Sequence, residues 1–485
     1  MVIGYFTADA VRDAEKDTGA LLTSGVLMRR AAGGLSHVVA DELLARTSGV
    51  YGRRVGLVIG SGDNGGDALY AGAALARRGV SVSAVLLDPD HAHPGGRAAF
   101  TEAGGRVVST LPSDIDVAVD GVVGLRGHGP LRPAAAAVFA QITAPIVAVD
   151  VPSGVDADTG LVNEPSVSAA TTVTFGMRRH AHILAAPSCG RVEVVDIGLT
   201  DPVPDLVELS DAEVAAMWPI PGPDDNKYTQ GVTGIIAGSA KYPGAAILCT
   251  GGAVAATSGM VRYCGSAAGE VVSHHAEVIA APDLDSTGRV QAWVIGPGAG
   301  TDDAAEELLE RILGTDLPVL VDADGLTVLA RRPDLVRSRT APTLLTPHAG
   351  EFERLAGHEV GTDRLAAVRG LAADLGATVL LKGRITLIAD DRAEQVIAND
   401  ARTSWSATAG AGDVLSGIAG SLLAAGLEPR LAAAAAARVH ALAAAMAARG
   451  APIGASQLVA GVSPALRALL AGDVVSLRGV AEPPA

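Results

Sequence analysis

Two glycines and one carboxylate lie together in the run T-A-G-A-G-D-V-L-S-G at 408–417. Residues 410–412 leave backbone N–H groups unshielded, and the apolar spacing after them predicts a helix from Asp413 to Ala425. Free N–H groups at the positive end of a helix bind anions, typically phosphate. A carboxylate beside phosphate makes sense where an arriving hydroxyl must lose its proton to become a nucleophile. The alternative is an Asp that caps a helix after a glycine-rich turn, so the chemistry depends on what else converges here.

Five polar, glycine-containing loops precede this run in the second half of the chain, each after a predicted strand, at 238–246, 296–301, 322–326, 346–352 and 382–386. Lys382 could meet phosphate charge. His348 is either a structural residue or an exposed one in a tight loop. Asp322 and Asp324 either orient Mg²⁺ or terminate a strand. Neither the P-loop pattern nor the protein-kinase H-R-D set occurs, so any phosphate chemistry is of another kind.

Three more loops follow predicted strands in the first half: G-S-G-D-N-G-G-D-A at 60–68, D-G-V-V-G-L-R-G-H-G-P at 120–130 and V-D-V-P-S-G-V-D-A-D-T-G at 149–160. The first does not match the dinucleotide fingerprint well, and its acids and amide suit a cation or a sugar hydroxyl better than a pyrophosphate. Carboxyl ends of parallel strands face one crevice, so Asn64, Asp120, Asp150 and Ser153 could meet. Oxygen and amide ligands favour a hard cation such as K⁺, Na⁺ or Mg²⁺; taken singly, each residue could simply cap a turn.

Alternation of short apolar, β-branched runs with helical spacing predicts parallel α/β architecture in both halves. In the first half this gives a doubly wound, Rossmann-like sheet. The prolines of 200–223 predict a linker near 200–209 and then a short helix capped by Ser210. We therefore expect two domains, 1–209 and 210–485. The expected strands are 55–59, 80–87, 115–119, 146–149, 171–175, 192–196, 233–237, 293–295, 319–321, 344–345 and 379–381, and the main expected helices are 9–15, 26–44, 69–78, 304–313 and 431–448.

Length and composition fit that organisation. The 485 residues exceed one ordinary core. A net charge of -16 argues against nucleic acid or an anionic membrane as partner. Cys189, Cys249 and Cys264 have no metal-ligand spacing and are expected to be buried thiols. The N-terminus lacks the pattern of a signal peptide, and the Ala-rich run to Ala448 contains Arg438 and His440, which indicates a core helix. We expect a cytoplasmic homo-oligomer that binds small molecules.

The first-half loops, with L-M-R-R-A-A at 27–32, resemble the motif set of the NAD(P)H-hydrate epimerase family, the YjeF N-terminal domain, over about residues 1–205. The resemblance implies interconversion of the two C6 epimers of hydrated nicotinamide dinucleotide, with K⁺ held by Asn64, Asp120 and Ser153. Asp150 is the candidate acid/base. The implied substrate-lining residues are Asp63, Asn64, Gly65, Gly66, Asp67, Gly124, Leu125, Arg126, Gly127, His128, Gly129, Pro130 and Asp150. The family usually has two asparagines in its first loop, and Asp63 here adds a negative charge near the ligand or the ion.

The second-half motifs, from N-K-Y-T-Q-G at 226–231 to the run at 408–417, resemble the ribokinase-like superfamily and, within it, the ADP/ATP-dependent NAD(P)H-hydrate dehydratase family, over about residues 210–478. The resemblance implies that Asp413 is the catalytic base, with ADP or ATP as co-substrate and Mg²⁺ as cofactor. Ala245, Gly298, His348 and Asp413 would contact the hydrated dinucleotide. Lys382, Gly383, Arg384, Ile385, Thr386 and Gly412 would contact the adenine nucleotide.

Together the two resemblances imply a bifunctional repair enzyme. One domain supplies the epimer that the other dehydrates, by phosphorylating the ring hydroxyl and eliminating phosphate. A small-alcohol kinase, a non-catalytic nucleotide sensor and a first half that binds without turnover remain alternatives. The sequence does not decide between ADP and ATP or between the NADH and NADPH hydrates, nor does it place the two sites relative to each other.

Overall fold

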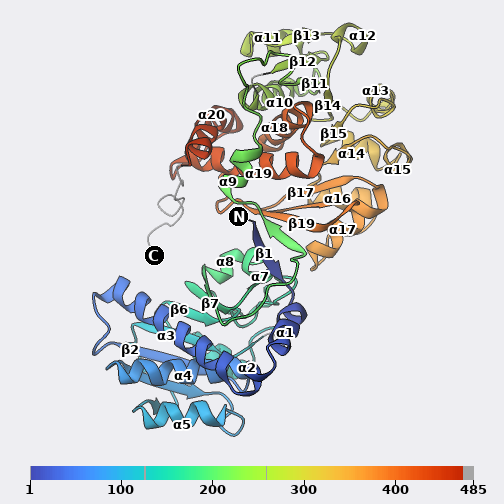
Figure 1. The fold of residues 1–485 in the computed structure, drawn as a ribbon. Helices are drawn as coiled ribbons and strands as arrows, with labels where there is room; N and C mark the ends of the chain where they lie inside the picture. The colour runs from blue at the N-terminus through green and yellow to red at the C-terminus, as the bar shows by residue number, and fades with distance from the viewer. Residues whose placement is uncertain (1, 125–126, 258, 473–485) are drawn as a thin grey trace. The chain divides into compact units, whose positions relative to one another are not determined.

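The computed structural model describes residues 2–124, 127–257 and 259–472, and they divide into two compact units. The first is Gly4–Leu206, drawn from blue to green in Figure 1. The second runs from Val207, from green to red, and also includes the residues that precede Gly4. A strand, β10 (Leu206–Glu208), lies inside the stretch expected to be a linker. The expected helix follows as α9 (Asp211–Met217), where the Ser210 side chain accepts a hydrogen bond from the backbone N–H of Glu213.

The first unit holds a seven-stranded, fully parallel sheet in the order β4-β3-β2-β5-β6-β7-β9. Alternate residues of β2 face different cores. Val55, Leu57 and Ile59 pack with α3 and α4, whereas Val58 packs with Phe139 of α6. This confirms a doubly wound sheet. The strands are β2 (Arg54–Ile59), β3 (Ser81–Leu86), β4 (Arg106–Val107), β5 (Val117–Gly121), β6 (Ile146–Val149), β7 (Thr171–Phe175) and β9 (Arg191–Val195). The helices are α2 (Ala20–Thr23), α3 (Val26–Thr47), α4 (Asp63–Arg77), α5 (Pro94–Glu102), α6 (Pro133–Phe139), α7 (Ala181–Leu184) and α8 (Ala186–Cys189).

The strand order reverses between β2 and β5. β3 and β4 extend the sheet on one side of β2, and β6, β7 and β9 extend it beyond β5. Such a switch point opens a crevice at the carboxyl ends of the two strands. The loops after β2 and β5 therefore border the crevice that the sequence predicted. Beside this sheet, β1 (Ile3–Phe6) pairs in parallel with β8 (Arg178–Arg179), and α1 (Ala8–Asp17) follows β1.

The glycine-rich loop after β2 is shorter than predicted. We expected a loop at 60–68 and a helix from Leu69, but α4 begins at Asp63. Two of the loop's glycines, Gly65 and Gly66, therefore lie in the helix, at positions where the neighbouring atoms leave no room for a side chain. A Cβ on Gly65 would lie 2.5 Å from the carbonyl oxygen of Gly60, and one on Gly66 would lie 3.0 Å from the ring of His93. Close packing thus overrides the low helix propensity of glycine.

The second unit contains strands in the order β13-β12-β11-β14-β15-β16-β17-β18-β19. The pairings are parallel as far as β17 and antiparallel between β17, β18 and β19. The strands are β11 (Val232–Ile236), β12 (Met260–Cys264), β13 (Ile279–Ala281), β14 (Ala292–Ile295), β15 (Val319–Val321), β16 (Thr343–Leu345), β17 (Thr378–Leu381), β18 (Ile385–Asp390) and β19 (Ala393–Asp400). The helices are α10 (Pro243–Ala256), α11 (Ala268–His274), α12 (Leu284–Thr287), α13 (Asp303–Leu313), α14 (Asp324–Leu329), α15 (Asp334–Arg337), α16 (Ala349–Ala356), α17 (Arg364–Leu375), α18 (Ala411–Ala424), α19 (Pro429–Ala448) and α20 (Ala455–Ala471).

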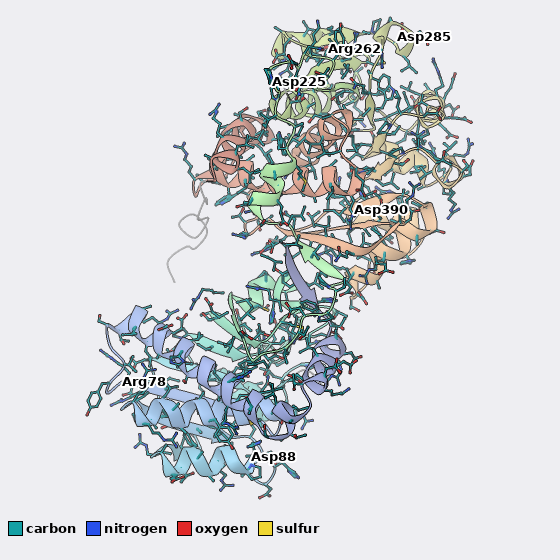
Figure 2. The ribbon with its side chains drawn as sticks, viewed as in Figure 1. Arg78, Asp88, Asp225, Arg262, Asp285 and Asp390 are labelled. Atoms are coloured by element: carbon teal, nitrogen blue, oxygen red, sulfur yellow. The ribbon has the colours of Figure 1, made fainter. Side chains whose placement is uncertain are left out.

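The β18–β19 hairpin corrects the expectation of a purely parallel sheet. Only two residues connect these strands, which is too few for the crossover that parallel neighbours need. Ile385 and Thr386, expected in a loop, therefore begin β18. Asp390, labelled in Figure 2, lies at the other end of β18 and accepts a hydrogen bond from Thr378 at the start of β17. This contact helps to fix the register of the hairpin against β17.

The helix that carries Asp413 packs closely against its surroundings. A Cβ on Gly417 would lie 2.0 Å from the Cys249 carbonyl oxygen on α10, and one on Gly420 would lie 2.0 Å from Val294 of β14. Figure 1 shows α18 beside α10 and α19. Glycine at these positions lets α18 approach both partners, which fixes where its N-terminus points.

The Ala-rich helix α19 belongs to the core of the second unit, as the sequence predicted. In the described residues it alone is long and apolar enough to cross a membrane by length and composition, yet 78% of its most apolar window is buried inside the unit. Arg438 pairs with Asp211 at 2.6 Å, and His440 contacts the Ala411 carbonyl oxygen at 2.9 Å. The three cysteines are free and buried, also as predicted.

Candidate active sites

Asp413 lies in the first turn of α18. Gly410 caps the helix in a left-handed conformation with φ 84°, which glycine adopts without strain. We expected the helix to begin at Asp413, but it begins at Ala411, so Gly412 and Asp413 both lie in its first turn. Burial raises the pKa of Asp413 to about 7; Asp322 adds to the rise, and Lys382 opposes it. A carboxyl with this pKa can accept a proton near neutral pH.

Lys382 holds a network of charged side chains together. Its Nζ lies 2.7 Å from Asp322 Oδ1 and 3.6 Å from Glu351 Oε2. Ser416, one turn after Asp413, donates a 2.6 Å hydrogen bond to Asp322 Oδ2. Although burial opposes it, the charges of Asp322 and Glu351 raise the pKa of Lys382, which keeps the ammonium charged. The network thus places a fixed cation near the base.

This network bears on the two acids whose role the sequence left open. Asp322 is almost fully buried and binds Lys382 and Ser416. Asp324 begins α14 and accepts a 3.0 Å hydrogen bond from the Gly300 N–H. Both carboxylates therefore connect neighbouring strand-end loops. The role of Mg²⁺ remains a prediction.

A pocket of about 260 Å³ lies beside the start of α18. Five of the six residues predicted to bind nucleotide line it, namely Lys382, Gly383, Arg384, Thr386 and Gly412. The sixth, Ile385, has a buried side chain in β18. The sequence analysis missed the other residues that line this pocket. Several of them belong to the polar run T-S-W-S-A-T at 403–408, which precedes Gly410 and Gly412. The missed residues include Asn399, Ala401, Thr403, Ser404, Ser406, Ala407, Ala437, His440 and Ala441.

The residues predicted to contact the hydrated dinucleotide come from neighbouring strand ends. A Cβ on Gly298 would lie 2.8 Å from the Ala245 side chain, so these two residues are adjacent. Tyr242, which the sequence did not single out, lies against Gly298 and is half exposed. His348 combines the two roles considered for it. Its Nδ1 caps α16, while its side chain is 56% exposed.

Glu351 connects His348 to the charged network. Its Oε2 accepts a 2.8 Å hydrogen bond from the His348 N–H and lies 3.6 Å from Lys382 Nζ. The Lys382 N–H in turn donates to the Pro347 carbonyl oxygen at 2.8 Å. The loops after β16 and β17 are therefore tied together by both backbone and side-chain contacts. The motifs carried Glu351 in T-P-H-A-G-E-F, but its link to Lys382 was not foreseen.

In the first unit, the three predicted K⁺ ligands meet at the switch point. Ser153 donates from N–H to Asp120 Oδ2 at 2.8 Å and from Oγ to Asp120 Oδ1 at 2.7 Å. Burial raises the pKa of Asp120 to about 6, against the hydrogen bonds from Ser153 and Val122. Asn64 Nδ2 donates to the carbonyl oxygens of Val123 and Val149, which orients its Oδ1 away from them.

This all-oxygen donor set fits a hard monovalent cation. Asn64 Oδ1 and the carboxylate of Asp120 lie where the loops after β2 and β5 adjoin, and a cation would also offset the burial of that carboxylate. Within the described ranges, no three His, Cys, Asp or Glu side chains are grouped to hold a metal ion. The K⁺ prediction draws on amide and hydroxyl oxygens as well, and it stays a prediction.

The loop predicted at 124–130 is partly described. Leu125 and Arg126 lie outside the described residues. Gly124 borders the predicted K⁺ ligand Asn64, since a Cβ there would lie 3.1 Å from Asn64 Oδ1. His128 contacts Asp156 in the loop after β6 at 2.9 Å. Gly127, Gly129 and Pro130 complete this segment, so it runs from the crevice towards the third predicted loop.

Asp150 follows β6 in a left-handed conformation with φ 67°, which is unusual for a residue other than glycine. Its Oδ1 accepts a 2.9 Å hydrogen bond from the Thr174 hydroxyl and forms a 2.9 Å ion pair with Arg179. His182 Nε2 contacts its carbonyl oxygen at 2.7 Å. Burial lowers the pKa of His182 to about 4, so that imidazole is neutral. The sequence did not reveal Arg179 and His182, although R-R-H-A-H after a strand is an unusual basic run.

The remaining predicted acids of the first unit lie on α4. Asp63 and Asp67 are one turn apart; Asp63 is exposed and Asp67 is only 6% exposed. Glu15 of α1 joins them, because its carboxylate interacts with Asp63, Asp150 and Arg179. Sequence reasoning missed Glu15, since nothing in an amphipathic helix marks which acid will face a distant loop. The crevice therefore holds more carboxylates than the motifs indicated.

Comparison with known proteins agrees with both halves of the chain. Residues 24–181 match the family model of the YjeF-related protein N-terminus, and residues 233–460 match that of NAD(P)H-hydrate dehydratase. The bifunctional NAD(P)H-hydrate repair enzyme Nnr of Mycobacterium tuberculosis (strain CDC 1551 / Oshkosh) is 59% identical over 433 residues, which cover 89% of this chain and 91% of that protein. The enzyme of the same name from Mycobacterium leprae is 58% identical over 440 residues, covering 90% and 92%.

A solved ribokinase-like superfamily protein from Enterococcus faecalis is 22% identical, with a TM-score of 0.50. The match covers 55% of this chain and 98% of that protein, and it supports the fold of the second unit. With relatives this similar along nearly their whole length, the chain belongs to the family of bifunctional NAD(P)H-hydrate repair enzymes.

Proposed function

We propose that the chain restores hydrated NADH or NADPH in two steps carried by its two halves. Residues 1–209 interconvert the R and S epimers, with K⁺ held by Asn64, Asp120 and Ser153. Residues 210–485 dehydrate the S epimer at the expense of ADP or ATP, with Mg²⁺ on the nucleotide. The observation that carries the proposal is the joining of Asp413, the Lys382 network and the pocket of predicted nucleotide-binding residues at one helix start.

In the dehydration step, Asp413 takes the proton of the ring hydroxyl, and the oxygen attacks the terminal phosphoryl group of the nucleotide. N–H groups at the start of α18 and the Lys382 ammonium stabilise the charge that spreads over the phosphoryl oxygens. A divalent ion would neutralise phosphate charge. Phosphate then leaves as the lone pair of the ring nitrogen forms a C6=N bond. Loss of a proton from C5 gives the C5=C6 double bond of NAD(P)H and returns the lone pair to nitrogen. Asp322 and Glu351 keep Lys382 in place through the step.

The test is a direct assay. The purified chain, given mixed hydrate epimers with ADP and Mg²⁺, should regain the absorbance of NAD(P)H and release inorganic phosphate and AMP. A stable phosphorylated product would instead identify a small-alcohol kinase, and binding without nucleotide consumption would identify a sensor. Asp413→Asn should abolish the recovery; full turnover by this variant would show that another group is the base.

The same proposal includes a cytoplasmic location and a homo-oligomeric state. Both extend the expectations drawn from charge and composition. Cell fractionation and light scattering of the purified chain test them.

A further inference from the structure

Two buried carboxyl groups of the first unit, one on α4 and one after β6, lie in opposite environments. Asp150 is fully buried, but its Oδ1 forms an ion pair with the Arg179 guanidinium and accepts a hydrogen bond from the Thr174 hydroxyl. Arg179 is itself buried and donates a hydrogen bond to the Met177 carbonyl oxygen at 2.7 Å. A carboxylate paired with a buried guanidinium keeps its charge, because protonation would leave that cation unpaired.

Asp67 has no such partner. Its side chain is 6% exposed, and Oδ1 is buried with no hydrogen-bond partner. A buried carboxylate oxygen without a partner is costly, so the neutral acid is favoured. Burial, with the charges of Asp63, Asp150 and Glu15, raises the pKa of Asp67 well above its ordinary value.

The groups that face Asp67 come from several elements. Asp63 lies one turn earlier on α4, Asp150 follows β6, and Glu15 comes from α1. His93, at the N-terminus of α5, lies against the neighbouring Gly66, but its Nδ1 accepts the Gly96 N–H. Two guanidinium groups act on other acids of this cluster: Arg179 pairs with Asp150, and both Arg179 and Arg12 act on Glu15. All the charges that act directly on Asp67 therefore favour its protonated form.

We propose that Asp67 is the proton donor of epimerisation and that Asp150 is the ionised carboxylate that receives a proton in return. This inference rests on the proposed epimerase activity of the first unit. Two nearby carboxyls with opposite protonation are the usual arrangement for paired acid and base catalysis. Glu15 is a weaker candidate donor because it is less buried and interacts with Arg179.

The proposed step balances without any co-reactant. Asp67 protonates the hydroxyl on C6, the C6–O bond breaks, and its electron pair leaves with water. The lone pair of the ring nitrogen forms a C6=N bond. Water adds to the opposite face of C6, the electron pair returns to nitrogen, and Asp150 accepts the proton that the added water loses. Proton transfer through solvent from Asp150 to Asp67 restores both groups.

The test compares Asp67→Asn with Asp88→Asn in the full-length protein. Asp88 is an exposed acid of the same unit (Figure 2), so its variant controls for an Asp-to-Asn exchange away from the cluster. Conversion of the pure R epimer is followed chromatographically without nucleotide. Asp67→Asn should slow epimerisation by about 100-fold or more, while Asp88→Asn and the dehydration of pure S epimer stay at wild-type rates. A rate for Asp67→Asn within threefold of wild type overturns the proposal.

A wild-type measurement keeps the proposal testable if Asp67→Asn does not fold. In oxygen-18 water, each epimerisation should place one labelled oxygen on C6, above the uncatalysed background. The epimerisation rate should also fall as pH rises through the pKa of the donor. Epimerisation without label overturns the proposed bond cleavage. If wild type does not epimerise at all but still dehydrates the S epimer, the proposed epimerase activity itself is wrong, which differs from failure of the Asp67 role alone.

Discussion

The pH dependence of dehydration tests the role of Asp413 most directly. Asp413 must be ionised to take the hydroxyl proton, and its pKa is raised to about 7. With that value, roughly one molecule in ten carries the active carboxylate at pH 6 and roughly nine in ten carry it at pH 8. The kcat/KM for the S epimer should therefore rise about tenfold over this interval, since it reports the free enzyme.

Asp322→Asn should move this limb to lower pH. The carboxylate of Asp322 raises the pKa of Asp413, and it also holds Lys382, whose charge lowers that pKa. Removing Asp322 therefore removes one effect and releases the other, and both changes favour the ionised base. We expect a displacement on the order of one pKa unit, or about 1.4 kcal/mol. Asn keeps an oxygen that can accept the Ser416 hydrogen bond.

The assay is the initial rate of NAD(P)H absorbance with purified S epimer and excess ADP and Mg²⁺, between pH 5.5 and 9. Asp285→Asn is the matched control, because the Asp285 side chain is 85% exposed and pairs with Arg311 (Figure 2). It therefore removes one surface carboxylate. Its profile should coincide with that of wild type. A wild-type rate that does not change between pH 6 and 8, or a limb that Asp322→Asn leaves in place, would refute the reasoning.

Three further outcomes follow from the structure. Asp413→Asn should unfold at a higher temperature than wild type at pH 8, and the difference should be smaller at pH 5. The reason is that the folded chain binds the Asp413 proton more tightly than the unfolded chain does. Wild-type stability therefore falls by on the order of a few kcal/mol as pH rises from about 4 to about 7. Gly417→Ala should lower the free energy of unfolding by about 1–3 kcal/mol or more, because its Cβ would meet the Cys249 carbonyl oxygen at 2.0 Å. Gly370→Ala in α17, where a Cβ meets nothing within 4 Å, should be neutral or stabilising; equal denaturation midpoints for the two variants would contradict the packing argument. Replacing K⁺ by a large organic cation should slow epimerisation and leave dehydration unchanged, and Asn64→Ala should remove the K⁺ response.

The order of strands and motifs could be predicted because apolar runs and glycine-rich loops are local signals. Residues 293–295, 319–321 and 379–381 are strands as expected, and the polar loops after them do adjoin. Two strands at one end of the second sheet, β12 and β13, were not predicted. The β12 run M-V-R-Y-C carries a charged residue and the β13 run I-A-A is only three residues long, so hydrophobic periodicity marks them weakly.

Element boundaries at the sites were harder to predict, because close packing determines them. The sequence of α4 reads as a loop, since Gly65 and Gly66 have low helix propensity. Only the position of the Gly60 carbonyl and the His93 ring shows why those positions exclude a side chain. The same holds for the β19 and α19 wall of the pocket predicted to bind nucleotide, because these elements come near Lys382 only in the folded chain.

In both units a motif locates an acid, but a cation from elsewhere in the chain determines what that acid can do. Asp150 belongs to a predicted motif, and Arg179, 29 residues later, forms an ion pair with it. Asp322 belongs to another predicted motif, and the ammonium of Lys382, 60 residues later, neutralises its charge. The acids left without a cation of their own, Asp67 and Asp413, are those whose pKa rises furthest towards the range where proton transfer is useful. The role of an acid in such a motif therefore depends on whether a cation from elsewhere in the fold pairs with it. Replacing the acid and its cation together tests that role more fully than replacing the acid alone.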